Sequence, residues 1–163
     1  METNGAEKTY IAILIQGLRS KLQILDELIM QTKLQEDLLK EETLNEEMFH
    51  AAIDQKALLL SRLTESDEGF EKLYARVSDI LQTRTGEFKQ EIVLMQDLIK
   101  AITEKSVQIK ALENQNLGRL ERYTKNERDR IKNYKVNSKT AANYYKNMTK
   151  LTEGESYFLD KKS

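Results

Sequence analysis

The sequence predicts an all-α fold, an antiparallel helical bundle or coiled coil of three long helices plus one short helix. The chain of 163 residues contains no proline, and apolar residues recur at three- and four-residue steps along most of it. Because one proline inside a helix costs about 3 kcal/mol, chains built mainly of long helices tend to exclude it. In addition, 33% of the residues are charged and no cysteine or tryptophan occurs, as is typical of helices with one polar face.

The first helix is predicted over residues 7–41. Its apolar stripe consists of Ile11, Leu14, Leu18, Leu22, Leu25, Leu28 and Ile29, and it continues through Met30, Leu34, Leu38 and Leu39. The segment Thr43-Leu-Asn-Glu46 has the pattern of a capping box, in which hydroxyl and carboxylate groups satisfy free backbone N–H groups. It predicts a second helix that extends to about Leu63, and so short a linker makes the two helices antiparallel neighbours.

The polar segment at residues 64–69, which ends in Gly69, is predicted to be a loop. The apolar residues Phe70, Leu73, Val77, Ile80 and Leu81 then predict the short helix, which ends near residues 85–86. A last long helix is predicted from about Glu87. Its expected inward positions are Phe88, Ile92, Met95, Ile99, Ile102, Ser106, Ile109, Leu112, Asn116, Leu120 and Tyr123. This spacing is a heptad seam with Ser106 and Asn116 as polar interruptions.

The apolar heptad pattern fades near the C-terminus, which divides the chain into two expected regions. Beyond Tyr123 the chain becomes rich in Arg, Lys and Asn and holds only a few apolar anchors. We predict a helical bundle with a long C-terminal helix over residues 1–148 and a flexible tail over residues 149–163.

Charge is distributed unevenly along the chain. Residues 1–70 carry 7 basic and 14 acidic side chains, and the remainder carries 19 and 13, so the two parts have net charges of −7 and +6. Antiparallel pairing of these parts is one explanation, and a basic partner site near the C-terminus is another. The basic, tyrosine-containing stretch at residues 119–139 also has some features of a nucleic-acid surface. Glu121, Glu127 and Asp129 dilute its charge, so a solvated helix face is the preferred interpretation.

Enzyme and cofactor signals are not found in the sequence. No glycine-rich phosphate-binding motif and no HExxH motif occurs. The single histidine, His50, lies between Phe49 and Ala51 and is interpreted as a packing or surface residue. Glu47 precedes it by three residues, but a di-iron site would need several more inward carboxylates. We expect a protein without catalytic residues, metal or cofactor.

Membrane and secretory signals are also not found. No run approaches the ~20 apolar residues that span a bilayer. Glu2 and Glu7 precede the first apolar stretch, where a secretory signal would carry basic residues. The lack of cysteine is consistent with a reducing compartment. We therefore expect a cytoplasmic protein.

The last long helix is the candidate binding surface, because shorter neighbours are not expected to cover it fully. An amphipathic helix of a partner protein could lie in a groove along it. The predicted groove residues are Leu98, Ile99, Ile102, Ile109, Leu112 and Leu117. Two alternatives remain open at this point: the same strip could close a homodimer, or the first helix could cover it.

From about residue 34 onward, the chain resembles the FlgN family of flagellar type III export chaperones. The resemblance is carried by Leu38-Leu39-Lys40-Glu41-Glu42, by Ile53-Asp54-Gln55-Lys56-Ala57-Leu58-Leu59, by Arg76 with Ile80-Leu81, by Leu98-Ile99, Ile102, Ile109 and Leu112, by Asn114-Gln-Asn116, and by Ser156-Tyr157-Phe158-Leu159-Asp160-Lys161-Lys162. The basic, tyrosine-rich extension after Tyr123 is longer than the tails of many relatives and departs from the family pattern.

The resemblance implies a cytosolic export chaperone. Such a protein would bind C-terminal amphipathic segments of hook–filament junction proteins and deliver them to the type III export gate. In the family a tyrosine after the last helix contributes to docking at the gate, which implies that role for Tyr123 or Tyr134. The alternative function is that of a structural or scaffolding coiled-coil protein with no client.

Overall fold

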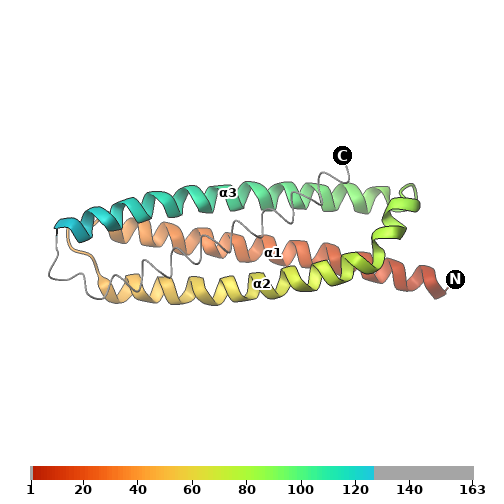
Figure 1. The fold of residues 1–163 in the computed structure, drawn as a ribbon, viewed down its shortest axis with the longest axis horizontal. Helices are drawn as coiled ribbons and strands as arrows, with labels where there is room; N and C mark the ends of the chain where they lie inside the picture. The colour runs from red at the N-terminus through yellow and green to blue at the C-terminus, as the bar shows by residue number, and fades with distance from the viewer. Residues whose placement is uncertain (1, 127–163) are drawn as a thin grey trace.

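The computed structural model describes residues 2–126, which form three long α-helices (Figure 1). Helix α1 spans Glu2–Lys40, α2 spans Glu46–Thr83 and α3 spans Lys89–Asn126. No strand occurs within these described residues. The predicted all-α bundle of three long helices is thereby confirmed. The predicted bundle region beyond residue 126 and the tail at residues 149–163 lie outside the described residues.

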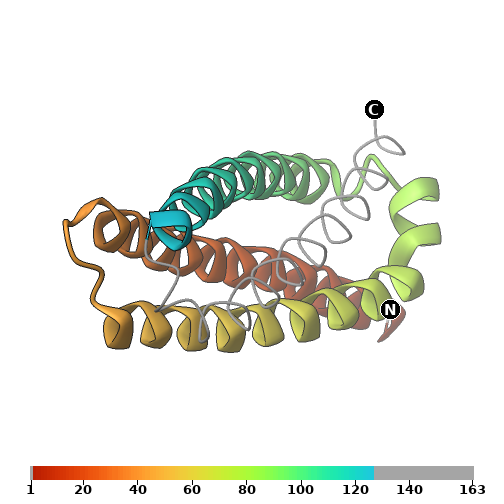
Figure 2. The same ribbon diagram turned by 60° about the vertical axis from the view of Figure 1, so that its left-hand side comes forward.

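Helix α1 is the central element of the bundle. It packs against both α2 and α3, which lie on either side of it (Figure 2). Helices α1 and α3 run in the same direction, and α2 runs antiparallel to both (Figure 1). The position of α3 in the bundle is therefore set mainly by its packing against α1.

The predicted loop at residues 64–69 and the separate short helix after it are wrong. The structure continues α2 without interruption through this segment. One glycine costs a helix only about 1 kcal/mol, and Leu63 and Phe70 on either side of the segment both pack in the core. The Thr64 hydroxyl donates to the Leu60 carbonyl at 3.1 Å, a bond that the helix itself permits. Burial of the flanking side chains therefore outweighs the polar composition.

The start of α2 is predicted correctly, but its capping residue is not. Asn45 rather than Thr43 is the N-cap, and its side chain accepts a hydrogen bond from the Met48 N–H at 3.1 Å. Glu46 and Glu47 occupy the first turn, where negative charge interacts favourably with the helix dipole. The Asn side chain serves the same purpose as the predicted hydroxyl, two residues later.

Within the part of the chain that the structure describes, buried apolar side chains form two clusters. The main core consists of Ile11, Leu14, Leu18, Ile24, Leu25, Leu28, Ile29, Leu59, Leu63, Val77, Leu81, Phe88, Ile92, Met95, Ile99, Ile102 and Ile109. The end cluster consists of Leu38, Leu44, Phe49 and Leu120, with Leu39, Ile53 and Tyr123 partly buried against it. It lies where α1 ends, α2 begins and α3 ends.

The predicted apolar stripe of α1 is wrong at two positions. Met30 and Leu34 are 66% and 36% exposed, whereas Thr32 and Gln35 are buried. A strict heptad continuation from Leu28 reaches residues 32 and 35, and α1 keeps that register although polar residues occupy it. Packing against two neighbouring helices therefore decides which side of α1 is buried.

Candidate functional site

The structure divides the predicted groove residues of α3 into buried and partly exposed positions. Ile99, Ile102 and Ile109 are at most 1% exposed and belong to the main core. Leu98 and Leu112 are partly buried and pack against that core. A partner that meets the folded bundle can therefore reach these two leucines but not the three isoleucines.

Leu98 and Leu112 share one face of α3, because residues two heptads apart in an α-helix are separated by almost four whole turns. Lys105 lies midway between them on that face, and its ammonium group forms an ion pair with Asp26 of α1. Leu22 of α1 lies one turn from Asp26 and is also partly buried against the main core. We call these three leucines the α1–α3 strip, a partly exposed apolar surface crossed by one ion pair.

The other predicted site residues are placed differently. Leu117 is partly buried, but it follows Leu112 by five residues and so points about 140° away from it around the helix. Tyr123 lies three turns beyond Leu112 on nearly the same face and packs against the end cluster. Tyr134 lies outside the described residues. The structure thus brings Leu98 and Leu112 together on one face and separates Leu117 from them.

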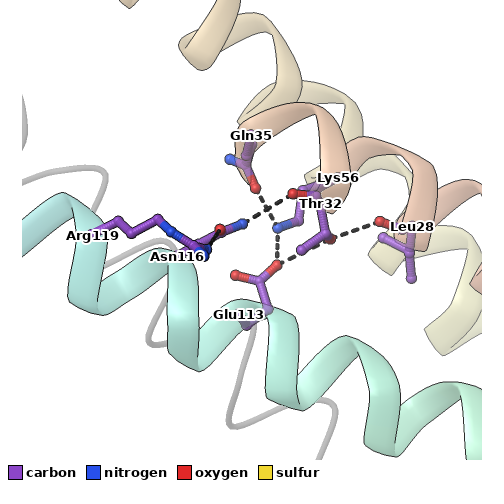
Figure 3. A network of polar contacts seen from close by, with 7 residues as sticks. All are labelled: Leu28, Thr32, Gln35, Lys56, Glu113, Asn116 and Arg119. Carbon is purple, nitrogen blue, oxygen red and sulfur yellow. Dashed lines mark hydrogen bonds and ion pairs between the residues drawn. The ribbon is translucent and has the colours of Figure 1, made fainter. Parts of the chain in front are cut away.

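A layer of polar side chains crosses the bundle between the main core and the end cluster. This polar layer consists of Thr32 and Gln35 from α1, Lys56 from α2, and Glu113 and Asn116 from α3 (Figure 3). All five residues are at most 6% exposed. Burial of such groups is unfavourable unless they are hydrogen-bonded, so the arrangement of their partners decides whether the bundle can contain them.

Lys56 is the centre of the polar layer. Its ammonium group forms an ion pair with the Glu113 carboxylate and donates to Gln35 Oε1 at 2.7 Å. The Thr32 hydroxyl lies 3.4 Å from the same oxygen of Glu113. These contacts join one side chain from α2 to α1 and α3, and Figure 3 shows them converging at one point.

Asn116 closes the polar layer on the side of α3. Its amide group donates to the backbone carbonyl of Thr32 at 3.0 Å, and its oxygen accepts from the Arg119 guanidinium at 3.2 Å. The Thr32 hydroxyl donates to the Leu28 carbonyl at 2.7 Å. Both functional groups of Asn116 are therefore satisfied, and α3 is bonded directly to the backbone of α1.

Burial lowers the pKa of the Lys56 ammonium group from 10.5 to about 7, because removal from water disfavours the charged form. The adjacent Glu113 carboxylate opposes this shift, since a nearby negative charge favours the ammonium form. The polar layer thus holds a lysine whose protonation depends on the balance between desolvation and one ion pair.

A second buried ion pair lies within the length of the main core. Lys21 Nζ of α1 is 2.7 Å from Asp67 Oδ1 of α2. Burial lowers the pKa of Lys21 and raises the pKa of Asp67, while their mutual attraction opposes both shifts. The other carboxylate oxygen, Asp67 Oδ2, is buried and accepts no hydrogen bond among the described residues. This pair joins α1 to the segment that was predicted to be a loop.

The connection between α2 and α3 is joined to the start of α1 by Arg84. Its guanidinium group lies 2.5 Å from Glu7 and forms a second ion pair with Glu87. It also lies over the ring of Phe88, 5.7 Å from the ring centroid. These contacts position the turn between α2 and α3 against the start of α1.

Metal-binding and membrane-spanning features were also sought in residues 2–126. His, Asp and Glu side chains nowhere gather in threes within this range as a metal ion would require. None of α1, α2 and α3 contains a stretch with the length and hydropathy of a bilayer crossing. His50, interpreted from the sequence as a packing or surface residue, is half-buried on α2.

The sequence interpretation missed the polar layer, although its pattern contained a signal. In α3 the steps from Ser106 through Ile109, Glu113 and Asn116 alternate regularly between three and four residues. The prediction instead placed Leu112 inward, because it is apolar and follows Ile109 by three residues, whereas the next residue, Glu113, is charged. A strict heptad count on all three helices would have placed Glu113 and Lys56 in the interior.

Comparisons of the chain with protein-family models, with curated proteins and with solved structures find no match.

Proposed function

We propose that this protein is a cytoplasmic flagellar export chaperone similar to the FlgN family. It would bind C-terminal amphipathic segments of hook–filament junction proteins and deliver them to the type III export gate. The observation that carries the proposal is the α1–α3 strip, in which Leu98 and Leu112, two heptads apart on one face of α3, flank the buried isoleucines. A partner helix can present apolar residues at the same period along its own length.

The strip suits reversible capture of a client helix. Its leucines are already partly buried, so a client would remove only the remaining apolar area from water, worth roughly 25 cal/mol per Å² before ordering costs. Lys105 and Asp26, which form an ion pair across the strip, also offer polar groups to the edges of a bound helix. Such a surface favours moderate affinity, which a protein that releases its client requires.

The test uses the full chain and a fluorescent peptide corresponding to the C-terminal segment of a hook–filament junction protein from the same source. We expect saturable binding in fluorescence anisotropy with a defined stoichiometry. The double variant Leu98→Glu/Leu112→Glu should weaken binding by at least ~100-fold, since the remaining leucine contacts are lost and two carboxylates would be desolvated against the apolar face of the client. A peptide of scrambled sequence controls for composition.

The matched control is Val107→Glu, because Val107 is an exposed apolar residue of α3, 59% accessible, that lies off the strip. It should leave the affinity unchanged. Far-UV circular dichroism must show equal helicity for all variants. Equal affinity of the two variants, or equal affinity for the scrambled peptide, would contradict the proposal.

Sedimentation of the peptide-free chain distinguishes the remaining alternatives. A dimer that is lost in Leu98→Glu/Leu112→Glu but kept in Val107→Glu, together with no peptide binding, would favour a self-associating structural protein. Gate docking through Tyr123 is a separate step, and Tyr123→Ala should reduce export without reducing peptide affinity.

A further inference from the structure

The main core and the end cluster are separated at the same level on all three helices. On α1 the buried apolar residues stop at Ile29 and resume at Leu38, and Thr32 and Gln35 are buried between them. On α3 they stop at Ile109 and resume at Leu120, with Glu113 and Asn116 between. Lys56 lies between Leu59 and Phe49 on α2. The polar layer is therefore a complete boundary and not an isolated polar contact.

We infer that the end cluster opens as a cooperative unit of its own while the main core stays folded, and that the polar layer is the boundary of this opening. Cooperative units in proteins follow contiguous packing, and units with less buried apolar surface open more easily. Among the residues that the structure describes, the end cluster contains four buried apolar residues, whereas the main core contains 17. The two clusters should accordingly differ strongly in how often they open.

The chemistry of the boundary favours this separation. When an apolar layer opens, its buried surface returns to water and the whole hydrophobic contribution is lost. When hydrogen-bonded polar groups open, water replaces many of the lost partners, so the net loss is smaller. Lys56 and Glu113 thus make opening at their level easier than opening through Leu25 or Ile102.

The opening would present Leu38, Phe49 and Leu120 to solvent at one end of the molecule without loss of the main core. This inference does not depend on the proposed chaperone function, since it concerns only the order in which parts of the bundle open. Failure of the peptide-binding test would leave it intact.

The test is native-state hydrogen exchange on the full chain, measured residue by residue over a series of low denaturant concentrations. Amides near Leu38, Phe49 and Leu120 should exchange at least ~100-fold faster than amides near Leu25 and Ile102. Their exchange should also show a weaker denaturant dependence, because a smaller surface is exposed. Equal protection and equal denaturant dependence in both clusters would overturn the inference.

Two double variants test the role of the polar layer. Lys56→Met/Glu113→Leu makes the boundary apolar and should reduce the difference in exchange between the clusters at least tenfold. Lys21→Met/Asp67→Leu removes an ion pair that lies within the length of the main core, and should preserve the difference. If both variants preserve it, or both abolish it, the polar layer is not the boundary.

The variant Leu120→Ala, which truncates one side chain of the end cluster, tests the same inference if Lys56→Met/Glu113→Leu does not fold. Leu120→Ala should speed amide exchange near Phe49 and Leu38. It should leave the amide exchange rates near Leu25 and Ile102 unchanged. Equal acceleration in both regions would show that the bundle opens as one unit, contrary to the inference.

Discussion

The main core and the polar layer occupy equivalent heptad positions of the same three helices, but they contribute differently to the fold. In the main core, Leu25, Leu63 and Ile102 are completely buried and gain stability from non-directional contacts. In the polar layer, Lys56 must meet both Gln35 and Glu113. Apolar layers tolerate a shift of one helix along another better than this set of bonds does. The comparison shows that the main core provides most of the stability of the bundle, whereas the polar layer fixes the alignment of the three helices along one another.

The largest expected effect comes from removing one member of the polar layer. Glu113→Leu takes the carboxylate away from buried Lys56 and should lower the free energy of unfolding by about 3–5 kcal/mol. Denaturant unfolding followed by circular dichroism measures this loss. The double variant Lys56→Met/Glu113→Leu should recover it and equal or exceed the parent in stability. A double variant as unstable as the single one would mean that the polar layer itself supplies the stability.

A cavity in the main core should have an effect of similar size but without such recovery. Ile102→Ala removes completely buried methyl groups and should cost about 2–5 kcal/mol. Val107→Ala on the same helix is the matched control, because Val107 is 59% exposed and should change stability by less than about 0.5 kcal/mol. Thermal and denaturant unfolding of both variants provide the comparison, and a small loss for Ile102→Ala would contradict its placement in the core.

A pH dependence should distinguish the charged polar layer from the apolar core. Since burial lowers the pKa of Lys56 from 10.5 to about 7, the unfolded chain binds more protons than the folded chain between these values. Stability should therefore increase as the pH rises from about 7 towards 10. The Lys56→Met/Glu113→Leu variant should lack this part of the increase. A profile identical in both proteins would mean that Glu113 holds Lys56 fully charged over the whole range.

The smallest effect is expected at the exposed ion pair of the α1–α3 strip. Lys105→Ala removes the contact with Asp26, whose side chain is 58% exposed. Surface pairs of this kind contribute about 0–1 kcal/mol, so the variant should be almost as stable as the parent in denaturant unfolding. Raising the salt concentration should remove what difference exists. A loss as large as that of Glu113→Leu would remove the distinction between the two ion pairs.

The correctly predicted positions and the missed ones follow from the same heptad pattern. Every buried apolar position of α3 was expected, because its isoleucines repeat at three- and four-residue steps. Glu113 and Lys56 were missed because a charged residue is rarely buried without a partner, and the partners lie 57 residues apart in the chain. The break predicted before Phe70 failed for a related reason, since local composition does not report the packing of Leu63 and Phe70 in the main core.

The sequence by itself determined the helical class and most of the buried face of each helix, because the absence of proline and the apolar period act locally along the chain. Only the tertiary structure decided which polar residues share a layer, that residues 46–83 form one helix, and that α1 is central. These properties depend on contacts between residues far apart in the chain, where a desolvated lysine becomes tolerable once a carboxylate and an amide from two other helices meet it.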